Sequence, residues 1–199
     1  MSAAGELPLF PLGTVLFPGG PLRLRSFEPR YLDMVRQCLR GSRPFGVVLI
    51  LEGLEAGAAA SVATTGTSAR LVDFDTLPDG LLGIDCLGEQ RFRLCRRWQQ
   101  ADGLNLAEVD YLPDDAPCAL PAELAHLGEL LREVLPQLGE RYAHVTAHYD
   151  DAGWVGNRWA EVLPLTCAER QQLLELADPL TRLTQVAAWS TRKPATSHV

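Results

Sequence analysis

The sequence predicts an α+β fold in which strands and helices are segregated along the chain. Up to residue 112, short apolar runs alternate with polar residues and are bounded by glycine and proline, as is typical of strands. Beyond residue 121, leucines recur at the three- and four-residue spacing of amphipathic helices. Between them lies a segment with three prolines and two aspartates. We therefore expect four parts: a β-rich subdomain over 1–112, a linker over 113–121, a helical subdomain over 122–190 and a disordered tail over 191–199.

The β-rich part opens with two apolar runs, residues 7–10 and 15–17, followed by a Pro-Gly-Gly-Pro turn at 18–21. The first run alternates, and because proline has no N–H to donate, we expect an edge strand with Pro8 on its exposed side. The two glycines of the turn permit positive φ. Residues 22–25 alternate again, which predicts a strand with its leucines on one face and its arginines on the other.

A helix is expected next, ending at Gly41. Pro29 costs no hydrogen bond in the first turn of a helix, and Glu28 suits the positive end of the helix dipole. One buried face is indicated by apolar residues at spacings of three and four: Phe27, Tyr31, Met34, Val35 and Cys38.

Five further strands are expected before the linker. The continuous apolar run at 45–51 predicts a central strand, and the Gly- and Ala-rich residues 54–63 predict a loop. Alternation then predicts strands over 64–74, 81–87, 91–98 and 104–111. The turns between these strands are expected at 77–80, at Gly88-Glu89 and at Asp102-Gly103.

The helical part shows three kinds of signal. An apolar stripe predicts a first helix: Leu124, Leu127, Leu130, Leu131, Val134, Leu135 and Leu138. Residues 154–163 suggest a short helix. Thr166 and Glu169 have the spacing of a capping box, which predicts a helix over 168–176. Asp178, followed by a proline at the first helical position, is expected to cap a last helix that runs to about residue 190.

Several of these stretches resemble the LON domain, the N-terminal substrate-binding domain of the ATP-dependent Lon proteases. The resemblance covers roughly residues 6–190 and rests on the opening LPLFPLGTVLFPGG…LRSFEPRYLDMV and on four further segments, namely 45–50, 66–70, Asp79-Gly80 with 88–93, and 157–164. It implies a PUA-like pseudo-barrel that encloses one helix, followed by a helical subdomain. Single-domain bacterial proteins carry the same module alone.

Composition and charge argue against several classes of function. Eighteen Lys and Arg against 25 Asp and Glu give a net charge of −7, which disfavours binding to nucleic-acid phosphates. No apolar run approaches the roughly 20 residues that span a bilayer, and no secretory signal is recognisable, so we expect a cytoplasmic protein without membrane contact. The five cysteines are scattered without a C-x-x-C pair, so we expect reduced, mostly buried thiols.

The sequence lacks the catalytic equipment of the Lon proteases. These enzymes use a Ser–Lys dyad for peptide cleavage and a P-loop lysine for ATP hydrolysis. This sequence has one lysine, Lys193, in the expected tail, and no G-x-x-x-x-G-K-[ST] motif. We therefore expect no catalysis of these kinds and no cofactor.

Two polar groups are better explained by structure than by chemistry. His144 and His148 would share one face of a helix beside Asp150 and Asp151, but no third firm ligand follows, so we expect no metal site. Glu28 could be a catalytic carboxylate, yet a structural role is favoured, in which Glu28 serves the helix N-terminus and Arg30 forms an ion pair within the fold.

Two groups on the predicted strands also have two interpretations. Arg91, Arg93, Arg96 and Arg97 with Trp98 could bind RNA, or Arg91 and Arg93 could form the outward face of a strand whose Phe92 and Leu94 point inward. The acidic net charge favours the second interpretation. Cys86 and Cys95, on neighbouring predicted strands, are read as buried thiols rather than nucleophiles.

Trp154, Asn157, Arg158 and Trp159 form the candidate binding site, because tryptophan and arginine are the residues most enriched at binding hot spots. The alternative is that Trp159 packs in the helical core and Trp154 covers the junction of the two subdomains. Phe10 and Phe17 of the opening segment complete the predicted peptide-binding set.

The favoured function is a non-catalytic module that binds unfolded or exposed polypeptide segments, at the junction groove or at the edge strand near residues 7–10. Such a module could act as an adaptor or regulator of proteolysis, with a protease as partner. The alternatives are an enzyme or small-molecule binder that uses the His144/His148 pair or Glu28 in a deep pocket, and RNA binding through the arginine strand. The client and the oligomeric state are not indicated by the sequence.

Overall fold

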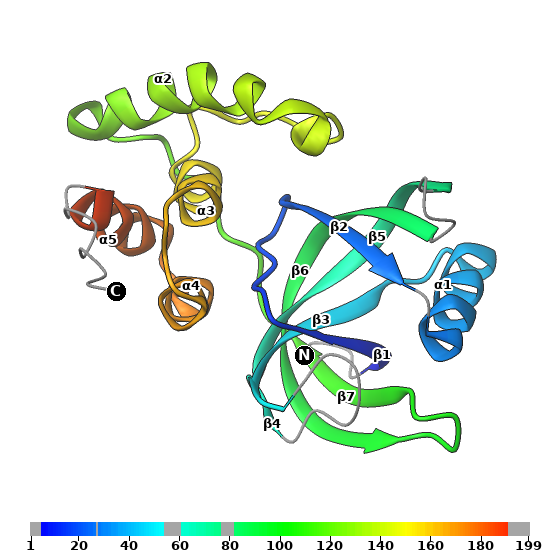
Figure 1. Ribbon diagram of the computed structural model, residues 1–199. Coiled ribbons are helices and arrows are strands. Elements are labelled where there is room, and N and C mark those ends of the chain that lie inside the picture. Colours follow the sequence, from blue (N-terminus) through cyan, green and yellow to red (C-terminus); the bar gives the residue numbers. More distant parts are fainter. Residues whose placement is uncertain (1–4, 27, 54–60, 77–81, 191–199) are drawn as a thin grey trace, which may run out of the picture.

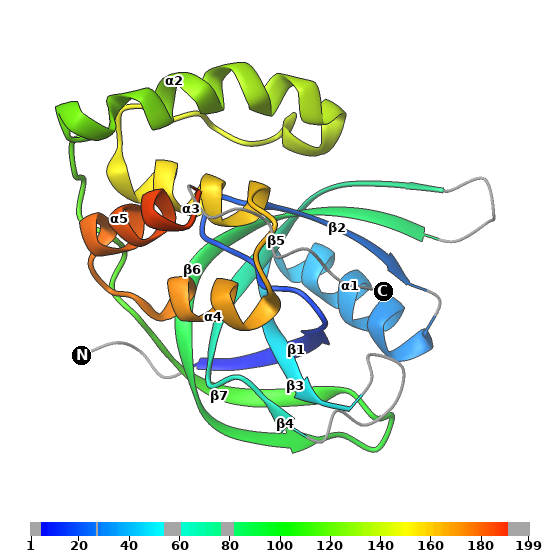
Figure 2. The ribbon, with the colours of Figure 1, turned by 60° about the vertical axis from the view of Figure 1, so that its left-hand side comes forward.

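The computed structural model describes residues 5–26, 28–53, 61–76 and 82–190 (Figures 1 and 2). The strands are β1 (Gly5–Leu12), β2 (Pro21–Ser26), β3 (Phe45–Glu52), β4 (Ser61–Val62), β5 (Thr65–Thr76), β6 (Leu82–Gln99) and β7 (Asn105–Tyr111). The α-helices are α1 (Pro29–Gly41), α2 (Ala125–Val134), α3 (Ala152–Val162), α4 (Cys167–Glu175) and α5 (Pro179–Ser190), and the 3₁₀ segments are η1 (Ala122–Leu124) and η2 (Leu135–Tyr142). The predicted α+β fold is confirmed, with α2–α5 gathered on one side of the strands.

The strands close on themselves. Neighbouring strands pair in the order β1-β7-β6-β5-β3, and β1 pairs again with β3, which completes the ring. β2 adds to β6, and the short β4 adds to β3. Helix α1 covers the strands beside β2 (Figure 1) and buries the face predicted from the sequence, with Tyr31, Met34, Val35 and Cys38 all inside.

The expectation that residues 7–10 form an edge strand is wrong. β1 pairs antiparallel with β7 over residues 5–9 and parallel with β3 over residues 9–12, so it has a partner strand along its whole length. β1 changes partner near residue 9, so each half of the strand is paired along one side only. In each half, alternate N–H groups therefore point away from the partner strand. Pro8 and Pro11 can be accommodated at such positions.

The expected turn at Gly88-Glu89 is also wrong, because β6 runs through it as one strand of 18 residues. The glycine serves a different purpose: a Cβ at position 88 would overlap the carbonyl oxygen of Phe17. Gly88 therefore lets the strand pass directly against the 18–21 turn. Cys86 and Cys95 consequently lie on the same strand rather than on neighbours.

The local signals at helix ends are confirmed. Thr166 and Glu169 form a complete capping box, and the Asp178 carboxylate accepts from the Thr181 N–H at 2.7 Å. The first helix ends at Gly41 as expected, and the residue in the left-handed conformation is the one that follows, Ser42 (φ 47°).

The first helix after the linker is shorter than its apolar stripe predicts. Ordinary helix ends at Val134, and η2 continues with a kink at Gly139 (φ 71°). Leu127 and Leu131 are buried, whereas Leu130 and Leu138 are more than 40% exposed. The short helix expected at 154–163 begins earlier, at Ala152.

The main apolar core joins the two halves of the molecule. It contains Val15, Phe17 and Leu49 from the strand half together with side chains of α2, α3, α4 and α5. The division at the linker therefore stays a prediction, because apolar packing is continuous across it. Phe27, the loop residues 54–60, the turn at 77–80 and the tail at 191–199 lie outside the described residues. Within the described part of the chain, no helix is long and apolar enough to cross a membrane.

Candidate functional site

The turn at residues 18–21 is the point where the two halves meet. Gly19 takes φ +69° and donates to the Gly88 carbonyl at 2.8 Å, while the Gly88 N–H donates to the Gly20 carbonyl at 2.9 Å. A Cβ at position 20 would overlap the carboxylate of Glu161 in α3. Glycine is thus required here because the turn lies tightly between β6 and α3.

A buried ion pair on α3 holds this turn. The Arg158 Nη2 donates to the Pro18 carbonyl at 2.9 Å and to Glu161 Oε1 at 2.7 Å, and the Tyr142 hydroxyl donates to Glu161 Oε2 at 3.1 Å. The Arg158 and Glu161 side chains are 0% and 5% exposed. Burial raises the pKa of Glu161 above its ordinary value of 4.5, although Arg158 and Tyr142 oppose that shift.

The raised pKa of Glu161 predicts the pH dependence of stability. A carboxyl group whose pKa is higher in the folded state contributes stability that is present below its unfolded pKa and is lost as pH rises through the folded pKa. We expect the free energy of unfolding of the wild type to fall relative to that of Glu161→Gln as pH increases above 4.5. Urea unfolding of the wild type and of Glu161→Gln at several pH values measures the two free energies. A wild-type value that stays constant or rises relative to that of the variant would contradict the raised pKa of Glu161.

A second network crosses the same junction. Asp115, in the 113–121 segment, accepts from Arg91 of β6 at 2.9 Å and from Arg182 of α5 at 2.5 Å. The two guanidinium groups also donate to main-chain carbonyls at the end of α4: Arg91 to Leu174 and Leu176, and Arg182 to Leu176. Burial lowers the pKa of Arg91, and Asp115 counteracts that effect. One carboxylate thus connects strand, linker and last helix.

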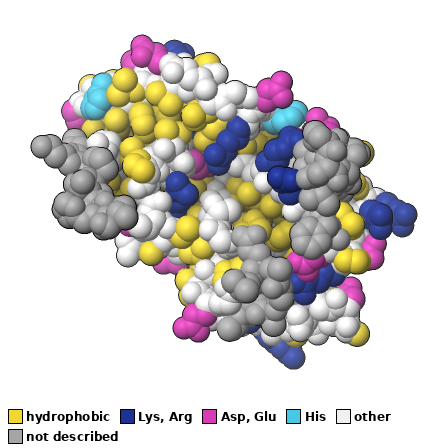
Figure 3. Space-filling view, viewed as in Figure 1, with side chains coloured by type: hydrophobic (Ala, Val, Ile, Leu, Met, Phe, Trp, Pro, Cys, Tyr) yellow, Lys and Arg dark blue, Asp and Glu magenta, His cyan; other side chains and the backbone are white. Residues whose placement is uncertain are grey.

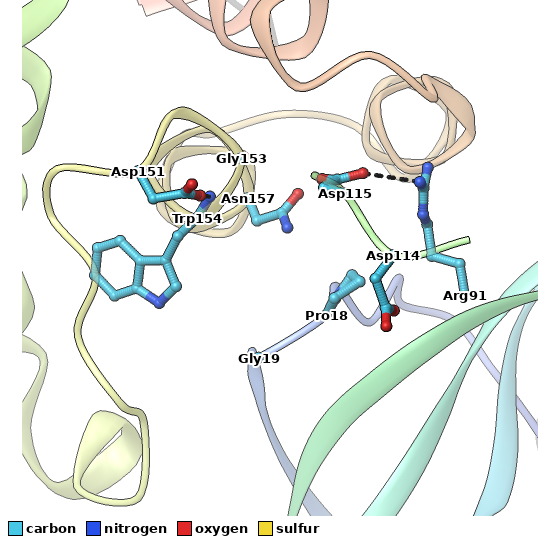
Figure 4. Close-up of a pocket in the computed structure, with 9 residues that line it drawn as sticks. All are labelled: Pro18, Gly19, Arg91, Asp114, Asp115, Asp151, Gly153, Trp154 and Asn157. Atoms are coloured by element: carbon cyan, nitrogen blue, oxygen red, sulfur yellow. Dashed lines mark hydrogen bonds and ion pairs between the residues drawn. The ribbon is translucent and has the colours of Figure 1, made fainter. Parts of the chain in front are cut away.

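Between these two networks lies a small cavity of about 250 Å³, which we call the junction pocket (Figure 4). Its lining comes from the turn, β6, the linker and the start of α3: Pro18, Gly19, Arg91, Asp114, Asp115, Asp151, Gly153, Trp154 and Asn157. In the view of Figure 4, the Asn157 carboxamide projects from α3 between the Trp154 indole and the Asp115 carboxylate.

Several buried polar atoms of α3 near this pocket lack partners within the described residues. Asn157 Oδ1, Trp154 Nε1 and the Nε and Nη1 of Arg158 are buried without a hydrogen bond within the described residues. Asn157 is 5% exposed and Trp154 is 8% exposed. A buried polar atom without a partner costs about 1–3 kcal/mol, so such a concentration on one helix suggests a binding function.

A larger concavity of about 830 Å³, which we call the groove, lies between the strand half and η2. The strand half contributes Leu22, Val72 and Leu87 to its lining, together with Arg23, which forms ion pairs of 2.7 Å with both Asp75 and Asp85. The opposite wall is formed by Glu140, Arg141, Ala143 and His144. On the face shown in Figure 3, hydrophobic side chains gather over the helical half, and charged ones are interspersed toward the strands.

The predicted site residues fall into two groups. Trp154 and Asn157 line the junction pocket, with Arg158 directly behind the turn. Phe10 and Phe17 are buried instead, at 6% and 0% exposure. They offer almost no surface to a peptide, since they are held by the packing of the strands.

Phe10 and the two tryptophans of the predicted set make specific contacts within the fold. Phe10 stacks on Tyr31 with ring centroids 3.9 Å apart, which fixes α1 on the strands. Trp159 packs in the main core and donates from Nε1 to the Leu127 carbonyl at 3.0 Å. Trp154 packs against the edge of Tyr149, with ring centroids 5.0 Å apart.

The structure also bears on the histidine pair and on Glu28. The segment that carries His144 and His148 is not helical, so the two side chains do not share a helix face. No group of three or more His, Cys, Asp or Glu in the described residues could hold a metal ion. Arg30 forms the expected ion pair, at 2.7 Å to Glu28, whereas Glu28 is the N-cap residue of α1 but its side chain makes no capping hydrogen bond.

The arginine strand is split between the interior and the surface. Phe92 points inward as expected, but Arg91 is buried under the helical half rather than exposed. Cys38 and Cys86 are buried, whereas Cys95 is exposed and two further cysteines are half-buried, so the expectation of mostly buried thiols is wrong. Burial raises the pKa of Cys86 to about 12, which makes it a poor nucleophile.

Sequence reasoning missed Asp115, Arg182, Glu161 and Tyr142. The i,i+3 spacing of Arg158 and Glu161 was a signal that could have been used. Nothing local marks Asp115 or Arg182, because their partners lie far away in the sequence.

The comparison with known families now identifies the class of protein. The family described as the ATP-dependent protease La (LON) substrate-binding domain matches residues 6–190, and the chain belongs to this family. The Lon N-terminal domain protein from Xanthomonas campestris has a crystal structure that is 40% identical, with a TM-score of 0.76, covering 93% of this chain and 98% of that one. The chain is therefore a Lon-like substrate-recognition module.

A more distant solved structure has the same fold, and curated sequences match with lower identity. The N-terminal domain of the Mycobacterium avium complex Lon protease is 16% identical, with a TM-score of 0.67 over 96% of this chain and the whole of that one. Lon protease 2 of Myxococcus xanthus is 27% identical over 94% of this chain and 24% of its own length. Protein cereblon of Xenopus tropicalis is 29% identical over 58% of this chain and 26% of its own length. The chain spans about a quarter of the length of the curated Lon proteases it matches.

Proposed function

We propose that this chain binds exposed segments of other polypeptides without transforming them, and that it can present them to a protease as an adaptor or regulator. The observation that carries the proposal is membership of a substrate-binding family, together with a groove between the two halves of the molecule. The volume of about 830 Å³ lies within the range of roughly 300–1,000 Å³ that is typical of ligand sites.

The groove has the features that an extended polypeptide needs. Apolar side chains of Leu22, Val72 and Leu87 lie beside the charged groups of Arg23 and its partners, so a segment of mixed polarity can be accommodated. Within the described residues β2 pairs with β6 alone, and β2 contributes Pro21, Leu22 and Arg23 to the groove. Strand addition at the second edge of β2 therefore replaces the edge proposed at residues 7–10.

The chemistry of the pockets supports binding rather than catalysis. An activated nucleophile needs a lowered pKa or an adjacent base. The one thiol that lines the groove, within the described residues, is Cys86, whose pKa is raised to about 12. Arg91, the single perturbed group of the described residues at the junction pocket, is held in ion pairing.

A substitution in the groove wall tests the proposal. Ala143 is exposed and lines the groove, so Ala143→Trp should fill it without disturbing the core. The assay measures binding of a reduced and alkylated model protein by fluorescence anisotropy, and we expect micromolar affinity for the wild type. The variant should bind about tenfold more weakly, because losing roughly 1.4 kcal/mol of binding free energy is a tenfold change in Kd.

The matched control is Ala125→Trp, which places the same side chain on exposed helix α2 outside the groove. It should bind as the wild type does. Equal affinity of both variants would move the site away from the groove, and an absence of binding to any unfolded polypeptide would refute the proposed function.

A further inference from the structure

The side chains that line the junction pocket include more acidic than basic groups. Asp114, Asp115 and Asp151 supply carboxylates and Asn157 supplies an amide oxygen, whereas Arg91 is the one cationic side chain among its lining residues. We propose that this pocket binds the guanidinium or ammonium group of an arginine or lysine side chain. The inference rests on the proposed function, because it assigns the kind of polypeptide segment that the module selects.

Two of the carboxylates are already in use. Asp115 is shared by Arg91 and Arg182. Asp151 caps α3, since its Oδ1 accepts from the Trp154 N–H at 2.8 Å and its Oδ2 accepts from the Cys118 N–H at 3.0 Å. These groups shape the pocket but have little capacity left for a ligand.

Asn157 and Asp114 are the acceptors that remain. The Asn157 side chain lines the cavity and is only 5% exposed. Its Oδ1 has no hydrogen-bond partner within the described residues. Asp114 lies at the exposed rim, and its carboxylate forms no ion pair or hydrogen bond in the described structure. An incoming N–H group satisfies the first, and a positive charge complements the second.

The occupant must be an organic cation of modest size. The described residues contain no group of three His, Cys, Asp or Glu that could hold a metal ion, and the amide of Asn157 requires a hydrogen-bond donor. The volume of about 250 Å³ is below the range of roughly 300–1,000 Å³ for whole small molecules, so one long side chain fits better.

Peptides that differ by a single charge test the inference. One peptide is acetylated and amidated and carries one arginine among apolar residues, and its match carries citrulline, which keeps the shape and loses the charge. We expect the wild type to bind the arginine peptide about tenfold more tightly, because a hydrogen bond to a charged group contributes roughly 1.5–3 kcal/mol. A third peptide, with citrulline and a free amino terminus, separates the side chain from a chain end as the source of charge.

Three variants locate the effect. Asp114→Asn and Asn157→Leu should each reduce the preference for arginine toward parity, while Glu133→Gln, which removes the same charge from exposed α2, should leave it unchanged. Asn157→Leu also removes an unpartnered buried polar atom, so its Tm should equal or exceed that of the wild type. A residue with a merely structural role would lower Tm when replaced and leave the preference intact.

The outcomes separate the two proposals. Equal binding of the arginine and citrulline peptides overturns the cation pocket and leaves polypeptide binding standing. Tight binding of the free-terminus citrulline peptide assigns the charge to chain ends and overturns the side-chain assignment. Failure of every peptide and of the unfolded model protein to bind overturns both.

Discussion

Replacing Asp115 with alanine should lower the free energy of unfolding by about 3–5 kcal/mol, the usual cost of leaving buried charge without its partner. Asp115 is the carboxylate shared by Arg91 and Arg182, whose side chains are 6% and 1% exposed. Without it, two guanidinium groups remain close together in a poorly hydrated site. Urea unfolding, followed by tryptophan fluorescence, measures the change.

The neighbouring residue provides the control. Asp114 is exposed and forms no ion pair in the described structure, so Asp114→Ala should change the free energy of unfolding by no more than about 0.5 kcal/mol. If both alanine variants are equally stable, the linker is not fastened by Asp115. If Asp115→Asn is as damaging as Asp115→Ala, charge rather than hydrogen bonding is the main contribution.

Replacing Glu161 with alanine should also cost about 3–5 kcal/mol at neutral pH, because Arg158 would be left fully buried without its carboxylate. Removing both charges should be much less damaging. Buried ion pairs replaced by apolar residues of similar size are often neutral or stabilising, so Arg158→Met with Glu161→Leu should recover most of the loss.

A double-mutant cycle checks this second prediction. The two single variants and the double variant are unfolded in urea under the same conditions, and the coupling energy is taken from the difference. Strict additivity of the two single losses would show that the pair does not act as a unit. Retained affinity of the double variant for unfolded protein would further show that the pair supports the fold and not the binding.

The elements predicted best from the sequence are those decided by neighbours along the chain. The capping box of Thr166 and Glu169 and the proline start of α1 depend on side chains within one helical turn. The buried face of α1 was equally readable, because its period reports one side of a helix irrespective of what covers it.

The mistakes occurred where a distant segment decides. A proline in a strand, or a glycine between two strand-like runs, is compatible with more than one structure. Which structure forms depends on the backbone segment that lies alongside. For Pro8 it is the change of partner from β7 to β3, and for Gly88 it is the carbonyl of Phe17. For Arg91 it is the end of α4, which covers an arginine that the alternation correctly placed outside the barrel.

The candidate site stays a prediction, and the structure shows only where its residues lie. Trp154, Asn157 and Arg158 were identified because their residue types are common at binding surfaces, and the structure places them beside a pocket or behind it. Asp115 was missed because its partners are 24 and 67 residues away. Phe10 and Phe17 were included because apolar side chains look the same in a core and in a binding surface.

The sequence alone determined the division into a strand-rich first part and a helical second part, several helix ends, and the family, because periodicity, end signals and motifs are written in neighbouring residues. The closure of the strands, the junction pocket and the buried charge networks were decided only by the tertiary structure. The reason is that pairing of strands and burial of charge depend on groups that are brought together from opposite ends of the chain, as Pro18 and Arg158 are, across 140 residues.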